Sequence, residues 1–90
     1  MAIHRDMIDK KKEEKPTVMV SGGFDPVHAG HIKLIRAAAR HGDVIVIANS
    51  DEWLFRKKGF VFMDFEARAL ILNAIKGVIL VDSVNDSDGT

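Results

Sequence analysis

The stretch Ser21-Gly22-Gly23-Phe24-Asp25-Pro26-Val27-His28-Ala29-Gly30-His31 decides the fold of this chain. It follows residues 17–20, a short β-branched apolar run typical of a buried parallel strand. Its last three residues begin the segment 29–41, in which apolar side chains recur at helical spacing up to Gly42. Open α/β sheets place their ligands at a turn of this kind, so the stretch predicts an α/β fold with a ligand site at the turn.

The residue types in this turn favour a phosphate group as the ligand. The adjacent Gly22 and Gly23 let backbone amides approach an anion, and the start of the following helix offers free N–H groups and a positive dipole end. His28 and His31 are three residues apart, so both imidazoles lie on one helix face and can reach the same phosphate. Gly30 between them leaves room for it.

Two histidines at this spacing are also compatible with metal ligation or with no role at all. No third metal ligand is evident beside them, so we expect no metal site formed by the protein itself. His4 and His41 receive no functional interpretation. The glycines, Phe24 and Asp25 around the pair favour phosphate binding.

The rest of the chain continues the alternation of strand and helix. A polar, basic loop that includes Lys57 is expected before Asp64, which is a good N-cap for a second helix that Gly77 ends. The expected strands are residues 17–20, 44–48 and 78–81. The βαβαβ order predicts a Rossmann-like, three-stranded parallel sheet with flanking helices.

Composition narrows the class of protein. The 90 residues carry 13 basic and 13 acidic side chains, so the formal net charge of zero gives no general attraction to nucleic acid or anionic membrane. There is no cysteine, and no apolar run approaches the roughly 20 residues of a membrane helix. We expect a cytoplasmic protein without nucleic-acid partners or a membrane span, with residues 1–16 as a charged leader, a solvated helix or mobile segment, and residues 17–90 as the domain.

Gly23-Phe24-Asp25 followed by His28-Ala29-Gly30-His31 resembles the Gly-x-Phe-Asp-x-x-His-x-Gly-His signature of the cytidylyltransferase-like nucleotidyltransferases. The resemblance continues through Asn49-Ser50-Asp51, Lys57 and Glu66-Ala67-Arg68. It implies the fold of that family, in a truncated version. The later Ser/Thr-rich segment of the family is not in this sequence.

The resemblance also implies roles for individual residues. His28 and His31 are expected to contact the triphosphate, Lys57 and Arg68 to neutralise phosphate charge, and Asp25 to order the turn. The predicted catalytic residues are thus His28, His31, Lys57 and Arg68, and the predicted nucleotide-binding residues are Ser21, Gly22, Gly23, Phe24, Asp25, Gly30 and Asp51. Lys33 and Lys58 are weaker candidates. Mg²⁺ is expected with the nucleoside triphosphate.

The expected reaction joins a nucleoside monophosphate to a small phosphorylated alcohol or sugar and releases pyrophosphate. CTP is favoured by similarity to glycerol-phosphate cytidylyltransferases, and ATP with a sugar phosphate by similarity to heptose-phosphate adenylyltransferases. A non-catalytic nucleotide-binding fragment is the alternative of another class. Aminoacyl-tRNA synthetases share a related His-x-Gly-His element, but a short neutral chain does not favour tRNA binding.

A homodimer is expected. Trp53, Phe55, Phe60 and Phe62 are interpreted as packing or subunit contacts, although Trp53 could border the base.

Overall fold

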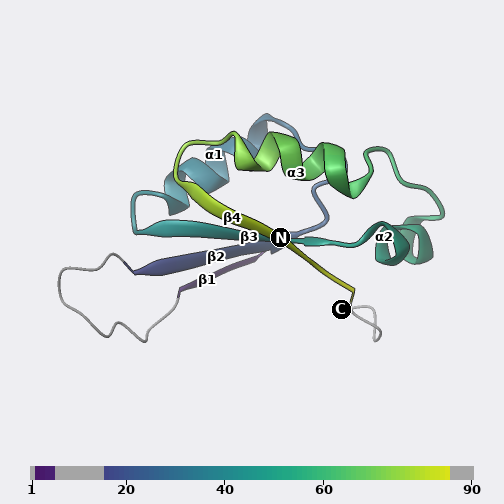
Figure 1. Ribbon diagram of the computed structural model, residues 1–90, viewed down its shortest axis with the longest axis horizontal. Coiled ribbons are helices and arrows are strands. Elements are labelled where there is room, and N and C mark those ends of the chain that lie inside the picture. Colours follow the sequence, from purple (N-terminus) through teal and green to yellow (C-terminus); the bar gives the residue numbers. More distant parts are fainter. Residues whose placement is uncertain (1, 6–15, 86–90) are drawn as a thin grey trace.

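The computed structural model describes residues 2–5 and 16–85, and its central feature is a parallel sheet beneath two helices (Figure 1). The parallel strands are β2 (Thr17–Gly22), β3 (Asp43–Asn49) and β4 (Val78–Val84). The helices are α1 (Ala29–Ala38), α2 (Asp51–Lys58) and α3 (Phe65–Asn73). This alternation confirms the predicted Rossmann-like α/β fold, with Ser21 to Gly23 at the carboxyl end of the first parallel strand.

The core lies between the sheet and the helices α1 and α3, which cover the same face of it (Figure 1). Alternate residues of β2 and β3 point to this face, because successive side chains of a strand point to opposite sides. The buried strand residues Val18, Val20, Val44, Val46 and Ala48 meet the helix residues Ile35, Ala38 and Leu72, together with Ile75 from the turn after α3. Gly77 makes the turn into β4 with φ 99°, in contact with Ala39, so a larger residue would clash there.

A fourth strand corrects the interpretation of the first residues. β1 (Ala2–Arg5) pairs antiparallel with β2, so these four residues form an edge strand and not a solvated helix or mobile segment. Such a strand depends on pairing with a distant segment and leaves little local signal in the sequence. Residues 6–15 lie outside the described residues, and the boundary between leader and domain stays a prediction.

Four other elements differ from the sequence interpretation, and one of them is α3, which ends at Asn73 and not at Gly77. The basic stretch expected as a loop is the helix α2, which Ser50 caps by accepting from Trp53 N and Gly59 ends at φ 84°. Acidic residues in its first turn and basic residues in its last complement the helix dipole. The α1 helix ends at Ala38, and β4 runs on to Val84 because its last residues pair with β3. Among the described residues, no helix has the length and apolar character needed to cross a membrane.

Candidate functional site

A cleft of about 490 Å³ opens between the β2–α1 turn and helix α2. The turn starts at the carboxyl end of β2, and α2 starts at the carboxyl end of its neighbour β3. Ligands of open α/β sheets bind at this edge. The residues that line the cleft are Gly23, Phe24, Asp25, Pro26, His28, His31, Trp53, Leu54, Lys57 and Lys58.

His28 and His31 form a stacked pair at the start of α1. Their ring centroids are 3.8 Å apart with 29° between the planes. The ring centroid of the buried Phe24 lies 5.0 Å from that of His31, in an edge-to-face arrangement. His28 Nδ1 accepts from Gly30 N at 3.1 Å, and His31 Nδ1 accepts from His28 N at 3.1 Å. The two histidines therefore cap the helix reciprocally, as Ser and Glu do in a capping box.

This capping fixes the chemistry that the pair can offer to a ligand. A neutral imidazole whose Nδ1 accepts a hydrogen bond carries its proton on Nε2. Burial lowers the pKa of His31, and the neighbouring His28 lowers it further, so His31 is neutral at neutral pH. Both histidines line the cleft, so each offers an Nε2–H donor that needs no rearrangement.

Gly30 serves the histidine pair in a way that the sequence interpretation did not foresee. A Cβ at this position would lie 2.9 Å from His28 Cε1, closer than real side chains approach. The room that Gly30 leaves is therefore occupied by the His28 ring. Gly30 is not among the cleft-lining residues.

Asp25 holds the turn against the segment between α2 and α3. Its side chain is 1% exposed and accepts from Phe62 N at 2.8 Å, Met63 N at 2.6 Å and Lys58 Nζ at 2.9 Å. Burial alone would raise the pKa of Asp25, but these donors outweigh it and hold the pKa below its usual value. The geometry agrees with the expectation that Asp25 orders the turn.

Arg68 lies inside the protein and not on the cleft. Its side chain is 0% exposed and donates to the carbonyl oxygens of Gly23 at 2.8 Å, Asn49 at 2.7 Å and Met63 at 2.9 Å. It also forms an ion pair with Asp51 at 2.6 Å. Arg68 thus ties α3 to the carboxyl ends of β2 and β3. Its guanidinium donates to these protein acceptors and is not part of the cleft lining, and its predicted role in neutralising phosphate charge stays a prediction.

The predicted site residues divide into two groups. The structure brings Gly23, Phe24, Asp25, His28, His31 and Lys57 around one cleft. Ser21, Gly22, Gly30, Asp51 and Arg68 are absent from the lining, and the weaker candidate Lys58 lies on it. The parts that these residues play in binding and catalysis stay predictions.

Trp53 and Leu54 line the cleft and were not predicted as site residues. They belong to α2, which the sequence interpretation took for a loop. Ser50 at the start and Gly59 after Lys58 are the cap signals that would have identified the helix. With the helix recognised, Trp53 and Lys57 at i and i+4 fall on one face.

Mg²⁺ finds no ready ligand set in the described residues. No group of three or more His, Cys, Asp or Glu side chains among them is arranged to hold a metal ion. The carboxylates nearest the cleft are already engaged, Asp25 with Lys58 and Asp51 with Arg68.

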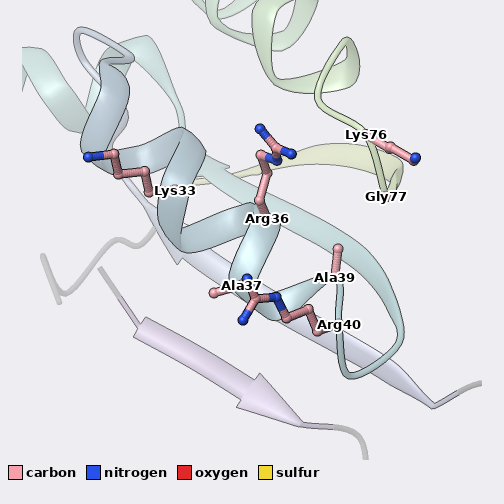
Figure 2. A pocket seen from close by; sticks show the side chains of 7 residues that line it. All are labelled: Lys33, Arg36, Ala37, Ala39, Arg40, Lys76 and Gly77. Atoms are coloured by element: carbon pink, nitrogen blue, oxygen red, sulfur yellow. The ribbon is translucent and has the colours of Figure 1, made fainter.

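A second groove, of about 560 Å³, lies along the outer side of α1 and at the turn before β4. Figure 2 shows its cationic side chains, Lys33, Arg36 and Arg40 from α1 and Lys76 from the turn. Arg36 and Arg40 lie near the C-terminal end of α1, where cations offset the negative end of the helix dipole. The groove and the cleft share no lining residue, so Lys33 lies outside the candidate site.

The family model described as cytidylyltransferase-like matches residues 19–89. The chain is 40% identical over 62 residues to a glycerol-3-phosphate cytidylyltransferase of Bacillus subtilis, a match that covers 68% of this chain and 48% of the relative. The corresponding enzyme of Staphylococcus aureus is 37% identical over 65 residues, with 71% and 49% covered. The bifunctional protein HldE of Gluconobacter oxydans is 45% identical over 67 residues, with 71% of this chain and 14% of that protein covered. The chain thus spans about half the length of the two cytidylyltransferases.

Proposed function

The chain belongs to the cytidylyltransferase-like family, and we propose that it carries the nucleotide-binding half of a nucleotidyltransferase. The observation that carries the proposal is the histidine pair, whose Nδ1 atoms are held by backbone N–H groups while both rings line the cleft. Two neutral Nε2–H donors at a helix start suit the oxygens of a triphosphate. The same cleft contains Lys57 and Lys58.

In the proposed reaction a phosphate oxygen of the acceptor attacks the α-phosphorus of the nucleotide. A bond forms between that oxygen and the phosphorus, the bond from the α-phosphorus to the oxygen bridging to the β-phosphate breaks, and pyrophosphate leaves. His28 and His31 donate to phosphate oxygens whose charge changes during attack, and fixed donors do this without reorganising. Mg²⁺, when bound to the nucleotide, neutralises part of the triphosphate charge.

We assign CTP and a small phosphorylated alcohol as the substrates. Support comes from the resemblance of the turn to glycerol-phosphate cytidylyltransferases and from the two relatives of that name. ATP with a sugar phosphate is the second assignment, because His28 to His31 and Asn49 to Asp51 also resemble heptose-phosphate adenylyltransferases. A cytoplasmic location remains a prediction from sequence.

The test is a pyrophosphate-release assay with CTP or ATP, each combined with glycerol 3-phosphate or a heptose phosphate. We expect release above background with CTP and glycerol 3-phosphate. Release only with ATP and the heptose phosphate would move the assignment to the adenylyltransferase. Nucleotide binding without release for any pair would favour the non-catalytic alternative, and absence of both binding and release would refute the proposal.

A further inference from the structure

Trp53 presents an unsatisfied donor at the candidate cleft. The residue lines the cleft, and its indole Nε1 is buried with no hydrogen-bond partner among the described residues. The indole nitrogen is a donor only, so no protonation change can remove its need for an acceptor. A buried donor without an acceptor lowers stability, and in a ligand cleft the missing acceptor is most simply the ligand.

Lys57 shares the same wall of the cleft. Its Nζ lies 5.7 Å from the centroid of the Trp53 ring, one helical turn along α2. Lys58, the other lysine of the cleft, is engaged by Asp25, whereas Lys57 forms no ion pair with any described residue. Lys57 is therefore available to pair with a bound anion. Without an anion, the cation–π contact with the indole ring holds the Lys57 ammonium beside the cleft.

The two walls of the cleft thus present different donors. On the α1 side, the histidines offer two fixed Nε2–H groups. On the α2 side, Trp53 and the exposed Lys57 line the cleft, and the indole N–H is buried beside it. The proposed reaction brings two anionic groups together, the triphosphate of the nucleotide and the phosphate of the acceptor.

We propose that Trp53 is a specificity-determining residue for the acceptor, and that its indole N–H donates to the acceptor's phosphate oxygen. Lys57 leaves the ring face to pair with the same phosphate. Because Nε1 is closed off from solvent without the ligand, Trp53 or its neighbours shift slightly when the acceptor binds. The proposal rests on the proposed function and names the part of the cleft that recognises the second substrate.

Packing is the alternative role for Trp53, but it does not account for the unpaired Nε1 or for the position of Lys57 over the ring. Phenylalanine would fill the same position without a buried unpaired donor, and phenylalanine occurs at nearby Phe55, Phe60 and Phe62. Packing also gives no reason for the position of the lysine above the ring. The two interpretations differ in what they predict for Trp53→Phe, which keeps a ring and removes only the donor.

The experiment uses the indole N–H resonance in ¹H–¹⁵N spectra, which is unambiguous because the chain has 1 tryptophan. The protein is titrated with glycerol 3-phosphate, with inorganic phosphate and with CTP. We expect a downfield shift with glycerol 3-phosphate, a weaker one with inorganic phosphate, and little change with CTP alone. A resonance that stays fixed at saturating glycerol 3-phosphate, or that moves downfield only with CTP, would overturn the assignment.

Calorimetry on two variants provides the second measurement. Trp53→Phe should weaken glycerol 3-phosphate binding by roughly tenfold or more and leave CTP binding unchanged, since one hydrogen bond to a charged group is lost. Lys57→Met should also weaken glycerol 3-phosphate binding, while Phe55→Leu on the exposed side of α2 should change the binding of neither ligand. Equal losses for both ligands in Trp53→Phe would indicate packing alone. If wild-type protein binds no nucleotide, the proposed function fails, whereas unchanged acceptor binding in Trp53→Phe refutes only this inference.

Discussion

The histidine pair is the residue-scale feature on which the proposed chemistry depends. A serine cap would stabilise the start of α1 equally well, but it would leave no imidazole in the cleft. Here the capping atoms are the Nδ1 atoms, so the hydrogen bonds that start the helix also fix which nitrogen carries the proton. Structural stability and the proposed phosphate recognition are thereby joined in the same two side chains.

The same arrangement makes the protein sensitive to acid. Protonation of His31 at Nδ1 would break the hydrogen bond that it accepts from His28 N. Burial lowers the pKa of His31, and the neighbouring His28 lowers it further. The unfolded chain takes up this proton near the ordinary value of about 6.5, and the folded protein only at lower pH. As the pH falls below that value the unfolded state binds more protons, so this contribution to stability is complete above it and declines below it.

We therefore predict that the free energy of unfolding decreases as the pH is lowered from about 7.5 to about 5.5. His31→Asn should make this decrease smaller. Urea unfolding at the two pH values measures it. His41→Asn is the matched control, because His41 is exposed and outside the cleft, and it should retain the wild-type slope. A slope that is the same in His31→Asn and wild type would show that His31 does not titrate in this way.

At the scale of elements, the three parallel strands and the helices α1 and α3 could be predicted because their signals are local. The β-branched runs of β2 and β3 and the Asp64 cap of α3 are visible in the sequence. The helix α2 was missed because it buries only Leu54 and so lacks a clear apolar periodicity. Because α2 was missed, Trp53 and Leu54 in the wall of the cleft were not predicted as site residues.

The part of the site that could not be predicted depends on contacts distant in sequence. A basic residue on a helix normally lies in solvent, and nothing near Arg68 in the sequence shows that carbonyls of Gly23 and Asn49 surround its guanidinium. The motif residues of the β2–α1 turn were predictable because their chemistry is contained in one short stretch.

The stability of α2 should depend on its two ends. Ser50→Ala removes the acceptor for Trp53 N, at a cost of about 1 kcal/mol. Gly59→Ala places a side chain at φ 84° and should cost about 0.5–1 kcal/mol or more. Thermal unfolding measures both, and Trp53 emission reports on the helix itself. Full wild-type stability in both variants would show that the caps do not hold α2.

At the scale of the whole molecule, the sheet is open in the described part of the chain, with β1 and β4 as its edge strands. β4 is the terminal strand of the sheet, and its Ile79 and Leu80 are 59% and 48% exposed. An unpaired apolar strand favours pairing with another copy. We therefore predict self-association, with Ile79→Lys weakening it by placing a charge on the edge. Sedimentation equilibrium measures the association, and a clean monomer at high concentration would count against the prediction.

The central claim is that His28 and His31 act in the transition state of nucleotidyl transfer. The most direct measurement is pyrophosphate release from CTP, with nucleotide affinity determined in parallel, for His28→Ala, His31→Ala, the double variant and the control His41→Ala. Each single change in the pair should lower turnover by about 10²–10³-fold with a much smaller loss of affinity. The double variant should lose less than the sum of the single losses in free energy, because both imidazoles serve one phosphate cluster. Near-normal turnover with collapsed nucleotide affinity would instead make the histidines anchors for the ground state and contradict the claim.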